Sequence, residues 1–144
     1  MTFWFSEYKN YFNIPNNFLC VAISKNIPHY FNKKNAVIPY KGIFNIPNIL
    51  ITQDFESTYY NYVDSAIRKM GWNGFNAYLI SMNEMYSNTF FHDDNDKQIK
   101  YSNIVFMFDE TEDNRHLPLI EKLFSNFGNS IKQFSNKTFD KSLF

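Results

Sequence analysis

Two uninterrupted apolar runs constrain this chain more than any other feature of its sequence. The first covers Phe18 to Ser24 and is closed by a polar turn, and the second covers Asn103 to Phe108 and is followed by acidic residues. Strands with one solvated face alternate apolar and polar residues, whereas strands buried on both faces are apolar throughout. Both runs are therefore predicted to be central strands of a sheet.

Apolar residues spaced by three and four predict an amphipathic helix that begins at Phe55. Thr52 or Asp54 is available as its N-terminal cap, and Gly71 stands directly after its last turn. The residues of the predicted apolar face are Phe55, Tyr59, Tyr62, Val63, Ala66, Ile67 and Met70. The sequence thus contains both the periodicity and the two end signals of a helix.

The same spacing predicts two further helices, one over residues 75–86 and one over residues 117–127 that is ended by Gly128. A short apolar segment at residues 2–5 is expected to pair as a strand. Residues 132–144 contain no complete helical repeat, so they are predicted to form an extra strand or a loosely packed tail.

The order of strand, loop and helix repeats along the chain and predicts an α/β fold. The 144 residues contain no repeat and no Pro- or Gly-rich linker, so residues 1–144 are expected to form a single Rossmann-like domain with a mainly parallel sheet flanked by helices. Sheets of this kind bind ligands outside the carboxyl ends of their strands. The loops after Ser24 and after Phe108 are therefore the predicted ligand-binding regions.

Composition and charge limit the classes of partner. Lysine and arginine equal aspartate and glutamate at 14 each, which excludes both a strongly basic nucleic-acid-binding surface and an acidic mimic of DNA. A lone cysteine, Cys20, in an apolar run favours a reducing compartment, and the sequence contains no leader and no long apolar stretch. A cytoplasmic protein without membrane partners is expected.

The aromatic content is 20%, and 20 of the residues are asparagine. The codons of asparagine, lysine, isoleucine, phenylalanine and tyrosine are rich in A and T. This composition therefore indicates an AT-rich bacterium, or a phage of one, as the source.

Three segments together carry a resemblance to a known family. An apolar strand leads into Ser24, Lys25 and Pro28, a tyrosine-rich segment covers 58–62, and a second strand over 104–108 precedes Asn114-Arg115-His116. This arrangement resembles the bacterial family called domain of unknown function 488, which closes with a Cys-His-Arg motif. The chain has no thiol there, so the resemblance implies a diverged member that keeps the pocket without any thiol nucleophilic catalysis.

The Asn114-Arg115-His116 segment is a candidate anion site. It opens the last predicted helix, whose free N–H groups would be joined by a guanidinium and an imidazole suited to phosphate. In the alternative interpretation Asn114 caps the helix, Arg115 pairs with Glu112 or Asp113, and His116 is solvated. The sequence leaves both interpretations open.

Acidic and basic side chains flank the two predicted ligand-binding loops. Asp109 and Glu110 are possible acidic partners for catalysis or for a cation, or they belong to a solvated turn. Ser24 and Lys25 end the other strand and form, with the lysines that follow, either a ligand-binding patch or a solvated loop. The chain contains four glycines and no glycine-rich phosphate loop, and no residue pattern indicates a cofactor or a metal site.

Two hypotheses of function follow. In the first, the protein is a binding protein, or a weak enzyme, for a nucleotide or nucleic-acid phosphate held at the loops after the central strands. In the second, it is a non-enzymatic interaction module, such as a virus-encoded inhibitor of a host defence protein, that binds through exposed aromatics. Tyr60 is predicted to point outward from its helix and to serve such an interface. The sequence specifies neither a reaction nor an oligomeric state.

Overall fold

The structure is a computed structural model of the whole chain. It describes residues 1–15, 17–23, 28, 36–37, 44, 54–87, 101–111 and 114–134.

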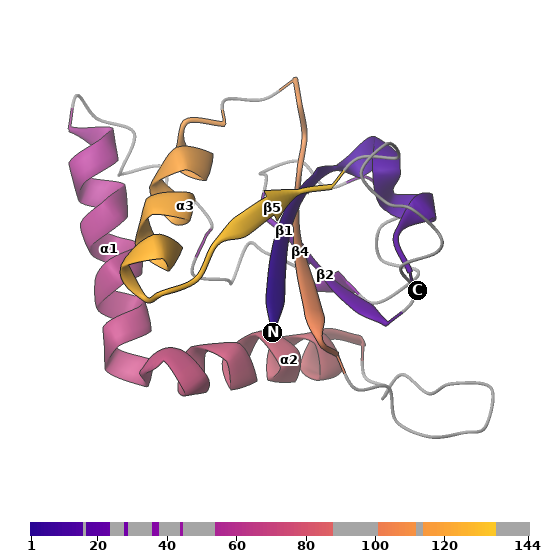
Figure 1. The fold of residues 1–144 in the computed structure, drawn as a ribbon, viewed down its shortest axis with the longest axis horizontal. Helices are drawn as coiled ribbons and strands as arrows, with labels where there is room; N and C mark the ends of the chain where they lie inside the picture. The colour runs from indigo at the N-terminus through magenta and orange to yellow at the C-terminus, as the bar shows by residue number, and fades with distance from the viewer. Residues whose placement is uncertain are drawn as a thin grey trace.

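A parallel sheet of five strands forms the centre of the fold, with the order β3-β2-β4-β1-β5 (Figure 1). The strands are β1 (Thr2–Glu7), β2 (Phe18–Ala22), β3 (Ala36–Val37), β4 (Asn103–Phe108) and β5 (Ile131–Gln133). All five residues of β2 and the four inner residues of β4 are buried, which confirms the central strands predicted from the two apolar runs. The α/β class with a parallel sheet is likewise confirmed.

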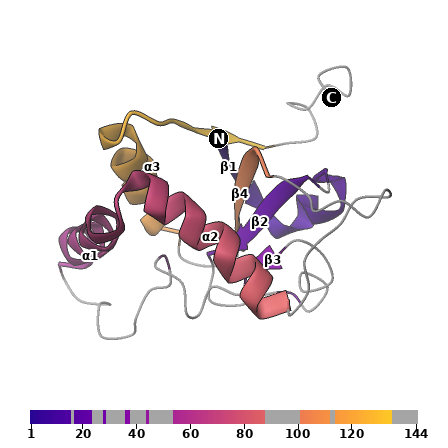
Figure 2. The same cartoon turned by 90° about the horizontal axis from the view of Figure 1, so that it is seen from below.

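Three helices lie on one side of this sheet: α1 (Phe55–Met70), α2 (Trp72–Ser87) and α3 (His116–Asn126). In Figure 2 they lie along the same face, and α1 packs against both other helices. Gly71 follows α1 with φ 73° and Gly128 follows α3 with φ 79°, a region that side chains with a Cβ rarely adopt. The two glycines therefore end their helices as the sequence predicted.

The sheet separates two buried clusters because successive side chains of a strand point to opposite faces. The first cluster, here called the helix-face core, lies between the sheet and the three helices. It includes Phe3, Phe5, Leu19, Val21, Phe55, Tyr59, Phe75, Ile104, Phe106, Ile120 and Phe124. The second cluster, the η1-face core, lies between the sheet and a short 3₁₀ helix, η1 (Tyr8–Asn13). It consists of Tyr8, Tyr11, Ile14, Phe18, Cys20, Ala22, Val105, Met107 and Phe134.

The chain leaves the neighbouring strands β1 and β4 in opposite directions. From β1 it passes through η1 on one face to β2, whereas from β4 it passes through α3 on the other face to β5. Such a point, where adjacent strands continue on opposite faces, opens a crevice at the carboxyl ends of the strands. The fold therefore has a topological switch point between β1 and β4.

Helix α1 corrects the sequence prediction for two tyrosines. Tyr60, predicted to point outward, is half-buried against the helix-face core. Its hydroxyl accepts a hydrogen bond from Asn126, and the Lys122 ammonium lies 5.4 Å from its ring centroid. Tyr62, predicted on the apolar face, is 44% exposed. The reason is that α3 lies beside α1 and covers the side that carries Tyr60.

Candidate ligand-binding site

A pocket of about 210 Å³ opens at the switch point between β1 and β4. The end of β1, the start of η1 and the loop after β4 contribute most of its wall. The lining residues are Glu7, Tyr8, Lys9, Pro28, Asp109 and Glu110. The pocket thus lies at the carboxyl edge of the sheet, where the sequence predicted a site, but half of its lining residues come from the end of β1 and the start of η1, to which the sequence assigned no function.

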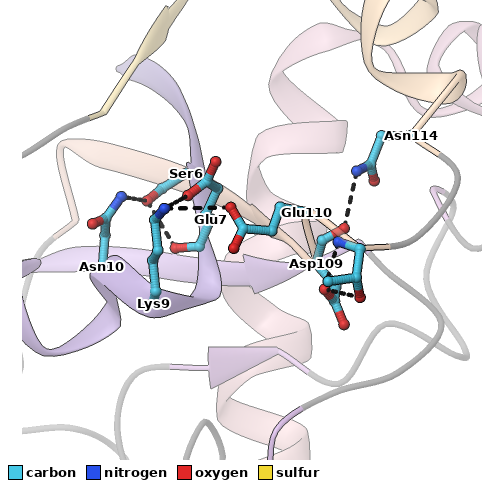
Figure 3. A network of polar contacts seen from close by, with 8 residues as sticks. Ser6, Glu7, Lys9, Asn10, Asp109, Glu110 and Asn114 are labelled. Carbon is cyan, nitrogen blue, oxygen red and sulfur yellow. Dashed lines mark hydrogen bonds and ion pairs between the residues drawn. The ribbon is translucent and has the colours of Figure 1, made fainter.

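Lys9 joins the two strands across this pocket. Its Nζ lies 2.8 Å from Oε2 of Glu7, the last residue of β1, and 3.3 Å from Oε2 of Glu110 in the loop after β4 (Figure 3). Both carboxylates hydrogen-bond to the ammonium, that of Glu7 having the larger effect, and they raise the pKa of Lys9. The Lys9 side chain is 63% exposed. Water screens exposed ion pairs, so a ligand can displace this one at little cost.

The loop after β4 holds Asp109 as a charged carboxylate. The Thr111 amide and hydroxyl donate hydrogen bonds of 2.9 Å and 2.7 Å to Oδ1 of Asp109. These donors, the amide above all, favour the charged form and lower the pKa of Asp109. Asn114 Nδ2 donates a 2.9 Å hydrogen bond to the Asp109 carbonyl and closes the loop, as Figure 3 shows.

The end of β1 is tied to η1 by two side chains. Ser6, which is 1% exposed, donates a 3.1 Å hydrogen bond to the Glu7 carbonyl, and Asn10 Nδ2 lies 3.4 Å from Ser6 Oγ. Because Asn10 belongs to η1, this link holds the 3₁₀ helix against the end of the strand. Glu7 and Lys9 are thereby presented on a fixed backbone.

Arg115 and His116 pack against helix α1. The Arg115 guanidinium carbon is 4.8 Å from the ring centroid of Phe55 in α1. His116 is only 2% exposed, and its ring meets that of Tyr59 edge-on at 5.9 Å. Of the predicted anion site, Asn114 contacts the loop that carries Asp109 and Glu110 through its hydrogen bond to the Asp109 carbonyl.

Other predicted residues lie outside the described part of the chain. Ser24 and Lys25 do, and so do the three lysines at positions 33, 34 and 41 that follow them. The basic patch predicted from these residues therefore stays a prediction. Among the described residues the carboxyl edge is formed instead by Glu7, Lys9, Asp109 and Glu110.

The described wall of the pocket is predominantly acidic. It carries the carboxylates of Glu7, Asp109 and Glu110 and the ammonium of Lys9. Within the described ranges no group of three or more His, Cys, Asp or Glu side chains is arranged to hold a metal ion. The arrangement is suited to a ligand with several hydrogen-bond donors, because carboxylates accept hydrogen bonds and cannot donate them.

Comparison with known protein families, curated proteins and solved structures finds no match to this chain. The resemblance to domain of unknown function 488 therefore stays a prediction. Among the helices that the structure describes, none combines the length and the hydropathy needed to cross a bilayer.

Proposed function

We propose that the protein binds a nucleotide at this crevice and holds it by the hydroxyls of its ribose. One observation carries the proposal: the carboxylates of Glu7 and Glu110, from the ends of adjacent parallel strands, flank one ammonium at a topological switch point. Dinucleotide-binding sheets use an acidic side chain near a strand end to accept a hydrogen bond from ribose. At this site two acidic side chains, Glu7 and Glu110, can accept such a hydrogen bond.

The two kinds of side chain have complementary roles toward a sugar. Glu7 and Glu110 accept hydrogen bonds from the 2′- and 3′-hydroxyls, and Lys9 donates to the oxygen atoms of the same hydroxyls. Because the Lys9 side chain is 63% exposed, it can shift from the carboxylates to the ligand without opening the fold. The proposed contact is with the ribose of the nucleotide. The sequence instead led us to expect a contact with its phosphate.

The size of the pocket supports a fragment of this kind. Pockets that enclose a drug-sized ligand measure roughly 300 to 1,000 Å³, whereas this one measures about 210 Å³. A sugar ring fits such a volume, and the base and any phosphate extend beyond it. We further propose that the protein acts in the cytoplasm, since its one cysteine, Cys20, is a buried thiol that suits a reducing compartment.

A second candidate function, docking of a host protein, is favoured by one residue. Phe12 on η1 is 65% exposed and lies on the element that also carries Lys9. Exposed aromatic side chains are enriched among the residues that dominate binding energy at protein interfaces. In this alternative Phe12 takes the role that the sequence assigned to Tyr60.

Isothermal titration calorimetry with adenosine, guanosine, cytidine and uridine tests the ribose proposal. A measurable affinity is expected for at least one ribonucleoside, and its 2′,3′-dideoxy analogue should bind at least ten-fold more weakly, since a hydrogen bond to a charged group contributes about 1.5 to 3 kcal/mol. Equal binding of the dideoxy analogue, or binding of none of the four, would overturn the proposal.

Three variants locate the site. Glu110→Gln should weaken binding by about ten-fold or more, whereas Glu56→Gln, an exposed glutamate on α1, is the matched control and should bind as the parent protein does. Arg115→Ala should also leave the affinity unchanged. A loss with Arg115→Ala alone would move the site to the start of α3, and a loss of host-protein capture with Phe12→Ala, without any nucleoside binding, would favour the second candidate.

A further inference from the structure

Resting on the proposed function, we infer that the crevice recognises the two neighbouring hydroxyls of a ribose as one unit. Its ligands carry a free 2′,3′-cis-diol, which nucleosides, 5′-nucleotides and the last nucleotide of an RNA possess. Internal nucleotides of an RNA and all deoxyribonucleotides lack it. The spacing of Glu7 and Glu110, together with the single proton of each hydroxyl, supports this class of ligand.

The carboxylates of Glu7 and Glu110 lie close together because both contact one ammonium. Nζ of Lys9 lies 2.8 Å from Oε2 of Glu7 and 3.3 Å from Oε2 of Glu110, and Figure 3 shows both contacts. The two carboxylate oxygens are therefore at most about 6 Å apart, and since an O–H···O hydrogen bond measures about 2.7 Å, two adjacent hydroxyl groups can span them.

The number of protons on the ligand decides how many carboxylates it can satisfy. A hydroxyl has one proton and therefore donates to one carboxylate, so a ligand that donates to both Glu7 and Glu110 needs two hydroxyls. Two hydroxyls in cis lie on the same side of a sugar ring and can face both acceptors at once. In a trans pair they lie on opposite sides of the ring, and one of them points away.

The backbone fixes the spacing of the two acceptors. Glu7 is paired with Phe108 in the parallel register of β1 and β4, and Glu110 follows two residues after this pair. Ser6 and Asn10 hold the end of β1 against η1 through hydrogen bonds. The two carboxylates are thus placed by the pairing of two strands, and the free protein already has the spacing that a cis-diol requires.

Esterification of the 3′-oxygen removes half of this recognition. In an RNA chain the 3′-oxygen of every internal nucleotide carries the next phosphate and has no proton, so only the 2′-hydroxyl can donate to a carboxylate. Loss of one hydrogen bond to a charged group weakens binding about ten-fold or more. The 5′-oxygen is not part of the diol, so a phosphate or a chain attached there leaves both hydrogen bonds intact.

The test compares by calorimetry four ligands with the same base: adenosine, 2′-deoxyadenosine, 3′-deoxyadenosine and adenine arabinoside. The arabinoside keeps both hydroxyls but inverts the one at the 2′-carbon, so its diol is trans. Each of the three analogues is expected to bind about ten-fold more weakly than adenosine. Binding of any of the three as tight as that of adenosine would overturn the inference. If another of the four ribonucleosides binds in place of adenosine, the series is made with its base.

Two variants assign each hydroxyl to a carboxylate. The preference for adenosine over 2′-deoxyadenosine should be largely lost in one of the variants Glu7→Gln and Glu110→Gln, and the preference over 3′-deoxyadenosine should be largely lost in the other. Glu56→Gln on α1 is the control and should keep both preferences. Loss of both preferences in a single variant, or of neither in any variant, would contradict the inference.

The dinucleotide ApA separates two sources of a free diol. ApA ends in a 2′,3′-diol, and it should bind about ten-fold more tightly than the same dinucleotide with a methyl group on its terminal 3′-oxygen. Equal binding of the two would count against the inference. Within the supported outcome, tighter binding of ApA than of adenosine indicates the 3′ end of an RNA, and binding no tighter than that of adenosine indicates a free nucleoside or nucleotide.

Failure of the inference is distinguishable from failure of the proposed function. If no ribonucleoside binds, or if the 2′,3′-dideoxy analogue binds as tightly as its parent, the proposed function is wrong. If the dideoxy analogue binds weakly but one of the single deoxy analogues or the arabinoside binds as tightly as the parent, only the inference is wrong.

Discussion

The two faces of the sheet are filled in different ways. On the helix face, Phe106 meets the rings of Phe3, Phe44 and Phe124 at centroid distances of 6.3, 5.1 and 5.5 Å. On the η1 face, the same strand contributes Val105 and Met107, which belong to a cluster with Phe18, Cys20 and Ala22 of β2. Aromatic pairs add about 0.5 to 1.5 kcal/mol each beyond the burial of their area. On the helix face, Phe106 therefore gains stabilisation from several ring contacts in addition to its burial.

The η1 segment also contributes side chains to the ligand-binding site. The connection from β1 to β2 is short, and η1 is the one helical segment that the structure describes within it. A connection of this length keeps Lys9 within reach of Glu7 and brings it to Glu110 across the strand boundary. The comparison teaches that both faces of the sheet have a buried core, of which the described part is larger on the helix face, whereas the η1 segment also supplies Lys9 to the site.

The largest expected effect is on the helix face. Phe106→Ala should lower the free energy of unfolding by about 3 to 5 kcal/mol, because the ring is fully buried and the neighbouring rings cannot close the cavity. Urea denaturation followed by circular dichroism measures it. Phe106→Leu is the control and should cost about 1 kcal/mol or slightly more. A loss below about 1 kcal/mol for Phe106→Ala would contradict the assignment of the main core to this face.

On the η1 face, Met107→Ala should lower the free energy of unfolding by about 2 kcal/mol, which is less than the loss expected for Phe106→Ala. This value is at the lower end of the range for a buried methionine. Cys20 is buried in the same cluster and reports on local opening of that face. A thiol reagent should label Cys20 slowly in the parent protein, as expected of a buried thiol, and several-fold faster in Met107→Ala. A greater loss of stability for Met107→Ala than for Phe106→Ala would reverse the comparison.

Tyr59 contributes a buried polar contact to the helix face. Its hydroxyl donates a 2.9 Å hydrogen bond to the Phe44 carbonyl, and burial raises the pKa of Tyr59, so it stays a donor throughout the neutral and moderately alkaline range. Tyr59→Phe should cost about 1 to 2 kcal/mol, because the carbonyl loses its donor. Tyr62→Phe, at a residue 44% exposed, is the control and should cost almost nothing. Equal melting temperatures for the two variants would rule out the buried hydrogen bond.

The smallest effect concerns the pH dependence of the site loop. Since the pKa of Asp109 is lower in the folded than in the unfolded chain, its contribution to stability is complete above the ordinary aspartate pKa of about 3.9 and is lost as the pH falls through the lowered value. Asp109→Asn should therefore melt slightly below the parent protein at pH 6, and this difference should disappear under strongly acidic conditions. A difference that grows on acidification would contradict the sign.

The sequence predicted those elements whose signals are local. The apolar runs predicted at 18–24 and 103–108 and the helical periodicity predicted at 55–70 and 117–127 depend on neighbouring residues alone. The sequence also contained a signal for His116 that the anion-site prediction did not use. His116 stands four residues before Ile120, so the helical period places both on one face of α3, and both are buried.

Long-range pairing accounts for what the sequence did not reveal. Nothing near Glu7 or Lys9 indicates that Glu110 lies beside them, because that proximity depends on the parallel pairing of β1 with β4. The outward orientation predicted for Tyr60 was wrong for a related reason, since α3 covers it from a distant part of the chain. Local patterns thus locate strands and helices, whereas the composition of the site depends on which strands become neighbours.

The place of β1 in the sheet has a consequence for synthesis on the ribosome. Thr2 to Glu7 pair with Asn103 to Phe108 on one side, and Phe3 to Phe5 pair with Ile131 to Gln133 on the other. The first partner of β1 is therefore translated about 100 residues after it and the second about 130 residues after it. At about 5 to 20 residues per second, the nascent strand waits roughly 5 to 20 s with its backbone unpaired and its phenylalanines exposed. During that interval β1 is a natural target for a chaperone, and its capture would delay folding without altering the native state.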